Sequence, residues 1–353
     1  MGAIKDQIAP TTGRGPWSPS ARSGGRDWID ASPSRRCPVC GGDSWCQTHR
    51  EGATVLCKRV AGGREKENRD GVTYYVHRLH GEVREVMEPL PPSTERAPVE
   101  ALDAAYQVVL RNLRLDPSDR EGLCRRGLND QAIEAGGYRS LPIEGRARLA
   151  KAVLEEVGED AARAIPGIVW KTADDGHGWW SLGGSPGLLV PVRDLEGRIV
   201  ALKVRRRDVE AGQQRYLYLS SARAGGASAQ AALHVPVVHA RLDAPLLVVT
   251  EGELKADVAT HLLGAPVVGL PGVSSYALAV LLAGALQPRR VAVAFDMDRI
   301  GNRFVARAAQ QLVAALRSAG HDTEVWRWNP AHKGVDDHLL ALRDANNGVC
   351  DAR

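Results

Sequence analysis

Apolar strands alternate with amphipathic helices over the last third of the chain. The runs LLVVT, PVVGL, VAVAF and TEVWRW are separated by segments of helical periodicity at 253–263, 274–286 and 302–318, and a last helix is expected near 335–343. Nearly continuous apolar strands between helices are typical of a parallel sheet that helices cover on both faces. We therefore expect an α/β domain at 242–345.

Two further segments precede this domain. Residues 99–166 have mainly helical periodicity, which is clearest at 101–113 and 147–157. Residues 167–241 carry strand signals instead, because GLLVPV and RIVALKVRRR flank the turn DLEGR and RYLYLSS follows them. These patterns predict a helical region followed by a small antiparallel α+β subdomain.

The N-terminal quarter predicts a separate small module. At 36–90, TVLCKRV and GVTYYVHRL alternate like strands around the polar turn GGREKENRD. Residues 1–35 are rich in Gly, Pro, Ser and Arg and hold too few apolar positions for a core, so we expect a disordered basic tail. We expect a linker at 91–98 and a C-terminal tail at 346–353.

The composition is that of an ordinary globular protein, with 44% hydrophobic and 25% charged residues among 353. The net charge of +4 is uneven, because residues 1–80 hold 13 Lys and Arg against 8 Asp and Glu. This basic excess indicates a polyanionic partner. No apolar run approaches the roughly 18 residues of a membrane span, and no secretory signal is recognisable, so we expect a cytoplasmic protein without membrane contact.

Four of the six cysteines cluster in the N-terminal module. Cys37, Cys40, Cys46 and Cys57 have the spacing Cys-x2-Cys-x5-Cys-x10-Cys, which suits a tetrahedral Zn²⁺ site in which the CPVC knuckle supplies two thiolates. His49 is the alternative to Cys57 as the fourth ligand, although Cys57 lies within a strand signal and is preferred. Four thiolates leave no open position on the metal, so the site is expected to be structural.

Basic and aromatic residues surround these cysteines. They are Arg35, Arg36, Trp45, Arg50, Lys58, Arg59, Tyr74 and Tyr75. Positive charge combined with flat aromatic faces suits single-stranded nucleic acid. The alternative is that the aromatic residues form the small core of a zinc ribbon, which must hold for at least one of the two adjacent tyrosines.

Carboxylates follow three strands of the expected parallel sheet. Glu251 comes directly after LLVVT, Asp296 and Asp298 follow VAVAF, and Asp336 and Asp337 follow TEVWRW after a short loop. The carboxyl ends of parallel strands meet at one edge of a sheet, where α/β proteins build their sites. Carboxylates gathered there favour Mg²⁺ or Mn²⁺, and two such ions about 4 Å apart promote phosphoryl transfer. A helix N-cap is the usual alternative for one such acid.

These residues resemble a known family. The segments TEGELKAD, FDMD and KGVDD are similar, in order and spacing, to the TOPRIM domain of bacterial and phage primases, topoisomerases and some nucleases. The resemblance covers about 243–345 and implies a Rossmann-like fold. It also implies that Glu251 is the catalytic glutamate and that Asp296 and Asp298 bind metal.

The resemblance extends upstream. In bacterial replicative primases a strand G-R-x-x-G-F-x-G-R and a segment K-Y-L-N-S-P precede TOPRIM, and here GRIVALKVR, which ends at Arg205, and RYLYLSS, which begins at Arg215, take their places. Ala201 and Val204 depart from the glycines of the pattern. The whole chain resembles a primase-like group of phages and plasmids with a zinc ribbon before TOPRIM. This implies primer synthesis from nucleoside triphosphates on a single-stranded DNA template.

Lysine usage adds a hint. The chain has 38 Arg and only 8 Lys, yet Lys203, Lys255 and Lys333 all lie in the motifs above. A compact ammonium suits a triphosphate or a substrate oxygen where a planar guanidinium does not, so we include Lys255 in the catalytic set. The alternative for Lys255 is a solvent-facing helix position. The candidate residues for binding nucleotide or nucleic acid are Lys203, Arg205, Arg207, Arg215, Arg299 and Lys333.

Three hypotheses follow. In the leading one, a primase-like nucleotidyltransferase, the aspartates hold two Mg²⁺ ions and Glu251 is a general base or a further ligand. The second is a TOPRIM nuclease or nicking enzyme with water or a tyrosine as nucleophile. The third is a non-catalytic module that binds single-stranded DNA. The chain has no G-x-x-x-x-G-K-[ST] motif, so a helicase must be a separate partner. His177, between two glycines, is expected to be a structural turn residue.

Overall fold

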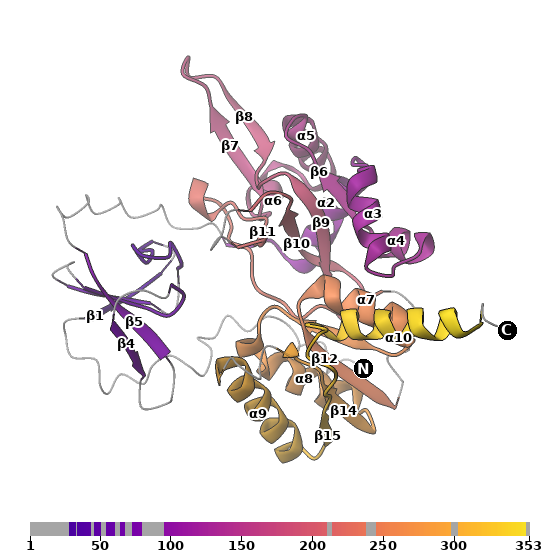
Figure 1. Cartoon of the computed structure of the whole chain (residues 1–353). Coiled ribbons are helices and arrows are strands. Elements are labelled where there is room, and N and C mark those ends of the chain that lie inside the picture. The colour runs from indigo at the N-terminus through magenta and orange to yellow at the C-terminus, as the bar shows by residue number, and fades with distance from the viewer. Residues whose placement is uncertain are drawn as a thin grey trace. The chain divides into compact units, whose positions relative to one another are not determined.

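The computed structural model describes residues 28–32, 34–43, 46–50, 54–60, 64–67, 73–79, 95–209, 214–237, 245–297 and 303–350. The chain forms two compact units, and Figure 1 shows the elements of each. The smaller unit contains the cysteine-rich residues up to Thr94 together with Ala222–Gly226. The larger unit contains Glu95–Ser221 and everything after Gly226.

The smaller unit is built on a five-stranded antiparallel sheet in the order β1-β2-β3-β5-β4. Its strands are β1 (Trp28–Asp30), β2 (Gln47–His49), β3 (Thr54–Cys57), β4 (Arg64–Glu67) and β5 (Thr73–Arg78). Strand β1 lies inside the segment that we expected to be disordered. It is ordered because its backbone pairs with β2 and Trp28 stacks edge-on against His49, with ring centroids 5.0 Å apart.

The helical region and the middle subdomain form one folded body. The helices are α2 (Val99–Arg111), α3 (Pro117–Arg125), α4 (Asp130–Gly136), α5 (Arg146–Val157) and α6 (Glu159–Arg163). The strands β6 (Arg139–Leu141), β9 (Gly187–Arg193), β10 (Ile199–Arg206) and β11 (Tyr216–Tyr218) make an antiparallel sheet in the order β11-β10-β9-β6. Strand β6 comes from the region expected to be helical, so the boundary expected at 166 does not separate two bodies.

One hydrophobic core explains this union. Buried residues of α2 and α5 pack against β9 and β10, with Tyr106 and Leu202 among the fully buried side chains. The hydroxyl of Tyr106 donates to the carbonyl of Pro166, 3.1 Å away, which ties α2 to the end of the helical stretch. A hairpin of β7 (Ile168–Thr172) and β8 (Gly178–Leu182) joins this core through its base (Figure 1). The exposed Trp170 lies in the middle of β7, opposite Trp180.

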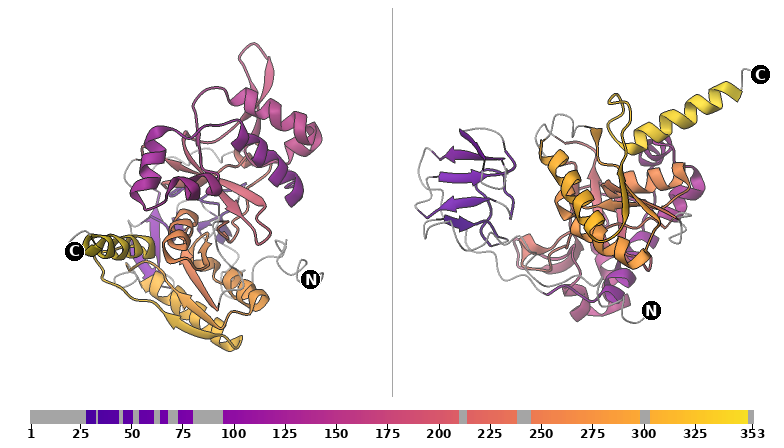
Figure 2. Two further views of the ribbon diagram at one scale, coloured as in Figure 1. Left: turned by 90° about the vertical axis from the view of Figure 1, so that its right-hand side faces the viewer. Right: turned by 90° about the horizontal axis from the view of Figure 1, so that it is seen from below.

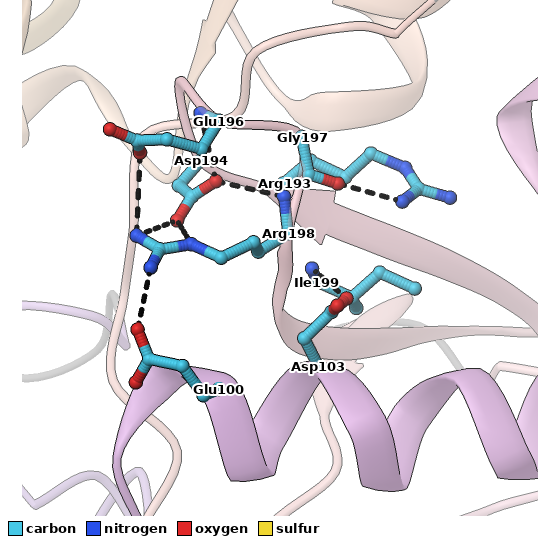
Figure 3. Close-up of polar contacts among 8 residues, drawn as sticks. All are labelled: Glu100, Asp103, Arg193, Asp194, Glu196, Gly197, Arg198 and Ile199. Carbon is cyan, nitrogen blue, oxygen red and sulfur yellow. Dashed lines mark hydrogen bonds and ion pairs between the residues drawn. The ribbon is translucent and has the colours of Figure 1, made fainter.

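The turn between β9 and β10 is fastened to helix α2 (Figure 3). Within the turn, the Asp194 carboxylate accepts hydrogen bonds from the backbone N–H of Glu196 and of Arg198, at 3.1 and 2.9 Å. The Arg198 guanidinium reaches Glu100 at 2.8 Å, and Asp103 accepts from the backbone N–H of Ile199 at 2.8 Å. This anchoring fixes the start of β10, which carries Lys203 and Arg205 toward the opposite end of the sheet.

The C-terminal part is the expected parallel sheet, in the order β13-β12-β14-β15. Its strands are β12 (Leu246–Glu251), β13 (Val267–Leu270), β14 (Arg290–Val293) and β15 (Asp322–Val325). Its helices are α7 (Glu253–Leu263), α8 (Ala277–Leu286), α9 (Arg303–Ser318) and α10 (Val335–Cys350). Alternate strand residues pack on α8 and α9 on one face and on α7 and α10 on the other (Figures 1 and 2). The predicted α/β class is confirmed.

A buried polar network joins the parallel sheet to the antiparallel one. The Asp257 carboxylate on α7 accepts a hydrogen bond from the hydroxyl of Tyr138 and lies 2.9 Å from Nε2 of His234. Nδ1 of His234 accepts from the backbone N–H of Arg193 at 3.1 Å. Burial and the nearby Asp257 charge raise the pKa of Tyr138 well above its ordinary value. Because all partners are buried, α7 is held firmly against both sheets, which places its N-terminus beside β10 and β11.

Candidate active site and zinc centre

The four predicted cysteine ligands come together in the smaller unit. Their sulfur atoms all lie within 4.8 Å of one another, and they are the only group of three or more potential metal ligands this close among the residues the structure describes. Sγ of Cys46 lies 3.7 Å from Sγ of Cys40 and 3.9 Å from that of Cys57. With Zn–S bonds of about 2.3 Å, a tetrahedron has edges of roughly 3.8 Å. The cluster therefore has the dimensions of a tetrahedral zinc site.

Backbone N–H groups point at these sulfur atoms as they do around thiolates. The N–H groups of Arg59 and Val60 donate to Sγ of Cys57, and that of Gly42 to Sγ of Cys40, each at 3.4 Å. Burial alone would raise the pKa of Cys40, but the Gly42 N–H and the Arg59 guanidinium lower it to about 7. His49 stacks on Trp28 instead and is no member of the cluster.

The basic and aromatic residues of the zinc ribbon are only partly available for a ligand. Tyr74 and Tyr75 are both half-buried on β5, where Tyr75 pairs with Cys57 across the ladder. Nη1 of Arg59 lies 3.7 Å from Sγ of Cys40 and so serves the metal site. Trp45 lies outside the described residues. The expectation that this module engages single-stranded nucleic acid stays a prediction.

A cavity of about 650 Å³ opens at the carboxyl edge of the parallel sheet in the larger unit. Its wall combines the start of α7, the loop before α10, the end of β14 and the strands β10 and β11. Its charged and hydroxyl-bearing lining residues are Arg126, Lys203, Tyr216, Tyr218, Glu251, Glu253, Lys255, Asp296, Lys333, Asp336 and Asp337. Seven of the residues predicted from sequence therefore share one cavity.

Glu251 reaches the cavity because β12 ends there. The chain turns sharply at Gly252, whose φ of 90° is in the left-handed region, and α7 begins at the next residue. Gly269 on the neighbouring strand lies directly behind this turn, since a Cβ at that position would come 2.7 Å from the Gly252 carbonyl oxygen. The hydroxyl of Thr250 donates to the carbonyl of Ala294 at 2.9 Å, which holds the ends of β12 and β14 together.

Asp296 lies at this edge and is 7% exposed. Its Oδ1 is paired with the ammonium of Lys255 on α7, and Nζ of Lys333 lies 3.9 Å from Oδ2. The backbone N–H of Met297 donates to the Lys333 carbonyl at 2.9 Å, so the loop before α10 is tied to the segment after β14. Asp298 and Arg299, which complete the predicted motif, lie outside the described residues.

The two neighbouring aspartates before α10 have different surroundings. Asp336 is 3% exposed and lines the cavity; its Oδ2 lies 3.2 Å from Nη1 of Arg126, and its Oδ1 has no hydrogen-bond partner. Burial and the Asp337 charge raise the pKa of Asp336, against the opposing charges of Lys255 and Arg126. Asp337 is exposed and accepts from the backbone N–H of Gly334 at 3.1 Å. The geometry favours Asp336 as the metal ligand and Asp337 as a helix cap.

Lys203 forms the most deeply buried ion pair of the cavity. Its Nζ lies 2.6 Å from Oε1 of Glu253, with side-chain exposures of 8% and 3%, and 4.5 Å from the centre of the Tyr218 ring. The hydroxyl of Tyr218 is buried and has no hydrogen-bond partner. Burial, together with the Glu253 charge, raises the pKa of Tyr218. The lysine thus connects β10 and β11 of the middle sheet to the first turn of α7.

Among the described residues, none of the arginines predicted to contact nucleic acid lines the cavity. Arg207 pairs with Asp116 and, at 2.6 Å, with Asp119, which favours a role in holding α3 against β10. Arg205 is half-buried and Arg215 is exposed, and neither lines the cavity. The turn residue His177 stacks on Trp179, with ring centroids 6.2 Å apart, in keeping with the structural role expected for it.

Sequence reasoning missed four of the charged or hydroxyl-bearing residues of the cavity, namely Arg126, Tyr216, Tyr218 and Glu253. Glu253 was within reach, because it is the second acid of the quoted motif TEGELKAD and stands at the first position of the helix. Arg126 and Tyr218 could not be found, because they reach the cavity from positions 210 and 35 residues away from the acids they meet. Only the packing of the helical region against α7 brings them there.

The donors of the cavity fit a hard divalent cation. Carboxylate oxygens are the ligands that Mg²⁺ and Mn²⁺ prefer, and a buried carboxylate oxygen without a partner, such as Oδ1 of Asp336, is costly unless a cation or a donor meets it. Asp336 together with Glu251 and Asp296 would hold such an ion.

Comparisons with known proteins bear on the fold. A family model described as "Domain of unknown function (DUF3854)" matches residues 236–345, and no curated protein matches the chain. The Aquifex aeolicus primase, in its zinc-binding and RNA polymerase domains, is 17% identical at a TM-score of 0.52 over 70% of this chain and 61% of that one.

Two further solved structures have a fold similar to that of this chain. The RNA polymerase domain of the Mycobacterium tuberculosis primase DnaG is 20% identical at a TM-score of 0.50, over 73% of this chain and 81% of that one. A DNA primase domain from Pseudomonas aeruginosa is 18% identical at 0.50, over 71% and 77%. The chain has the fold of a DnaG-type primase core. It spans about three fifths of the Aquifex aeolicus structure. No helix in the described ranges is long and apolar enough to cross a membrane.

Proposed function

We propose that this chain is a primase-like nucleotidyltransferase that joins nucleotides into short primers on single-stranded DNA. One observation carries the proposal: the fold of DnaG-type primase cores here encloses a cavity in which Glu251, Asp296 and Asp336 lie beside three lysines. The solved structure of the Mycobacterium tuberculosis relative contains a double-stranded DNA with a 6-nucleotide overhang, which supports a nucleic-acid substrate.

The predicted acids have distinct roles in this reaction. Asp296, Asp336 and Asp298 would hold the divalent ion or ions, and Glu251 would accept a proton or complete the metal site. When bound, Mg²⁺ neutralises the triphosphate and lowers the pKa of the attacking 3'-hydroxyl. Lys333 is 67% exposed at the cavity mouth, so its ammonium can meet the outer phosphates of an incoming nucleotide.

The remaining parts would present the template. The zinc ribbon would hold single-stranded DNA through its basic and aromatic residues, and Arg205 on β10 and Arg215 before β11 would contact the template. The reaction requires an opened duplex inside the cell. A separate helicase would supply it, because this chain has no P-loop motif of its own.

Incubation of the zinc-loaded protein with single-stranded DNA, Mg²⁺ and labelled ribonucleotides tests the proposal. Wild type should make short template-dependent products, and Glu251→Gln should make at least about 100-fold less. Asp344→Asn, an exposed position on α10, is the matched control and should retain activity. No product from the wild type, beside an active primase control, would contradict the proposal. Shortening of the template with Mn²⁺ and without nucleotides would indicate a nuclease instead.

A further inference from the structure

A lysine ammonium is paired with one of the acids that are expected to bind metal in the cavity. Lys255 is the third residue of α7, and its ammonium is paired with Oδ1 of Asp296, with side-chain exposures of 19% and 10%. A pair this buried is little screened by water, so each partner depends strongly on the other. A divalent ion could bind Asp296 through this oxygen only by displacing the ammonium.

Lys255 also lies against the second acid of the site. A Cβ placed on Gly334 would come 3.1 Å from Cε of Lys255 and 2.2 Å from Oδ1 of Asp336. Both side chains therefore pack over the same glycine, so Lys255 lies near Asp336 as well as being paired with Asp296. A side chain at position 334 would press on both, and the Asp336 carboxylate would have to shift.

The charges of the described cavity lining nearly balance, without Asp298, which lies outside the described residues. Five carboxylates line the cavity, and four cationic side chains face them. Besides Lys255, two of these cations are paired at short range, Lys203 with Glu253 at 2.6 Å and Arg126 with Oδ2 of Asp336 at 3.2 Å. Two divalent ions at about 4 Å from each other repel strongly and are stable only among an excess of carboxylates. The described lining holds an excess of one.

The carboxylate oxygens of Asp296 and Asp336 differ in whether they have a positively charged partner. Both oxygens of Asp296 face ammonium groups, Oδ1 that of Lys255 and Oδ2 that of Lys333 at 3.9 Å. Oδ1 of Asp336 is buried and has no partner. Oδ1 of Asp336 is therefore the oxygen that an added cation would satisfy, whereas the charge of Asp296 is already offset by two ammonium groups.

We infer that the Lys255 ammonium takes the place of one of the two cations, so that the site binds a single divalent ion through Asp336. Lysine suits this role because its ammonium is compact and carries its charge at one point. The metal stoichiometry does not depend on the reaction, while the catalytic meaning of the lysine rests on the proposed function. In that reaction Lys255 would be a fixed positive charge that offsets the charge on a substrate oxygen.

Counting bound Mn²⁺ on the zinc-loaded full chain tests the inference. Equilibrium dialysis with Mn²⁺, read by electron paramagnetic resonance, should find one ion per wild-type chain. Lys255→Met removes the charge but keeps the stem, and it should bind a second ion. Lys255→Arg retains a cation and should stay at one. Lys151→Met, a 78% exposed lysine on α5, is the matched control and should also stay at one.

Two results would overturn the inference. One is two Mn²⁺ ions, or none, on the wild type. The other is an unchanged count of one on Lys255→Met, provided that its circular dichroism and zinc content match those of the wild type. Failure of primer synthesis with the predicted Mn²⁺ counts would contradict the proposed function and leave this inference standing, so the two failures are distinguishable.

Discussion

The zinc ribbon and the acidic cavity are both metal-binding arrangements, yet they are built in opposite ways. In the ribbon four sulfur atoms lie within 4.8 Å of one another, and backbone N–H groups occupy their outer sides. In the cavity the carboxylates are spread over three strand ends, ammonium groups lie among them, and Oδ1 of Asp336 has no partner. The first site is closed and suits a structural metal, whereas the second is open and suits chemistry.

The largest effect should come from removing the zinc. Binding energies of about 10–16 kcal/mol make structural zinc part of the folding energy, and the buried core of the smaller unit consists largely of its cysteines. Cys46→Ser should therefore unfold the ribbon and leave the larger unit folded. Limited proteolysis with zinc analysis checks this. Cys124→Ser, a cysteine outside the cluster, is the control. Co-operative unfolding of the larger unit together with the ribbon would contradict the comparison.

The next effect concerns the pair Lys203 and Glu253. Breaking a buried ion pair at one partner costs about 3–5 kcal/mol, because the other charge stays buried alone. Lys203→Met should lower the unfolding free energy of the larger unit by that order. The double variant with Glu253→Gln should lose less than the sum of the single losses. Urea unfolding of the wild type, the two single variants and the double variant measures the coupling. Strictly additive losses of unfolding free energy would show that the pair is not coupled.

A smaller effect is expected at Gly334. Gly334→Ala would press on Oδ1 of Asp336 and on the Lys255 stem, so Mn²⁺ affinity should fall by about tenfold, as for other groups that orient a ligand. Mn²⁺ titration by electron paramagnetic resonance measures this. Gly284→Ala on α8 has open space around it and should leave the affinity unchanged. Equal affinities of the two variants would remove Asp336 from the metal site.

The smallest effect distinguishes two arginines. Arg215 is exposed beside β11, so Arg215→Met should reduce the salt dependence of single-stranded DNA binding by about 0.7 in the logarithmic slope, the value for one phosphate contact. Arg207 pairs with Asp119, so Arg207→Met should lower stability without changing that slope. Fluorescence anisotropy of labelled single-stranded DNA at several salt concentrations measures the slope for each variant. A change of slope for Arg207→Met alone would reverse the two roles.

The sequence predicted the parts whose signal is local. The apolar strands of the parallel sheet and the cysteine spacing each depend on neighbouring residues, and both the sheet and the four-thiolate cluster are present. The acids Glu251, Asp296 and Asp336 were found because parallel strands bring their carboxyl ends to one edge. Their shared cavity follows from topology alone.

Contacts between segments that lie far apart along the chain could not be predicted from the sequence. Strand β6 was hidden in a helical pattern, because three residues give no periodicity and its partner β9 lies 46 residues later. Asp336 could be separated from Asp337 only by the burial of one and the capping bond of the other. The pairing of Lys255 with Asp296 spans 41 residues and depends on how α7 meets the end of β14.

Primer synthesis by Asp296→Asn, compared with wild type, tests the central claim that the acidic cavity is the catalytic site. Asn keeps the shape and one acceptor oxygen but removes the charge that pairs with the Lys255 ammonium in the cavity. The account predicts template-dependent product from wild type, loss of at least about 100-fold in Asp296→Asn, and unchanged binding of single-stranded DNA. Equal primer yields from the two proteins would contradict it.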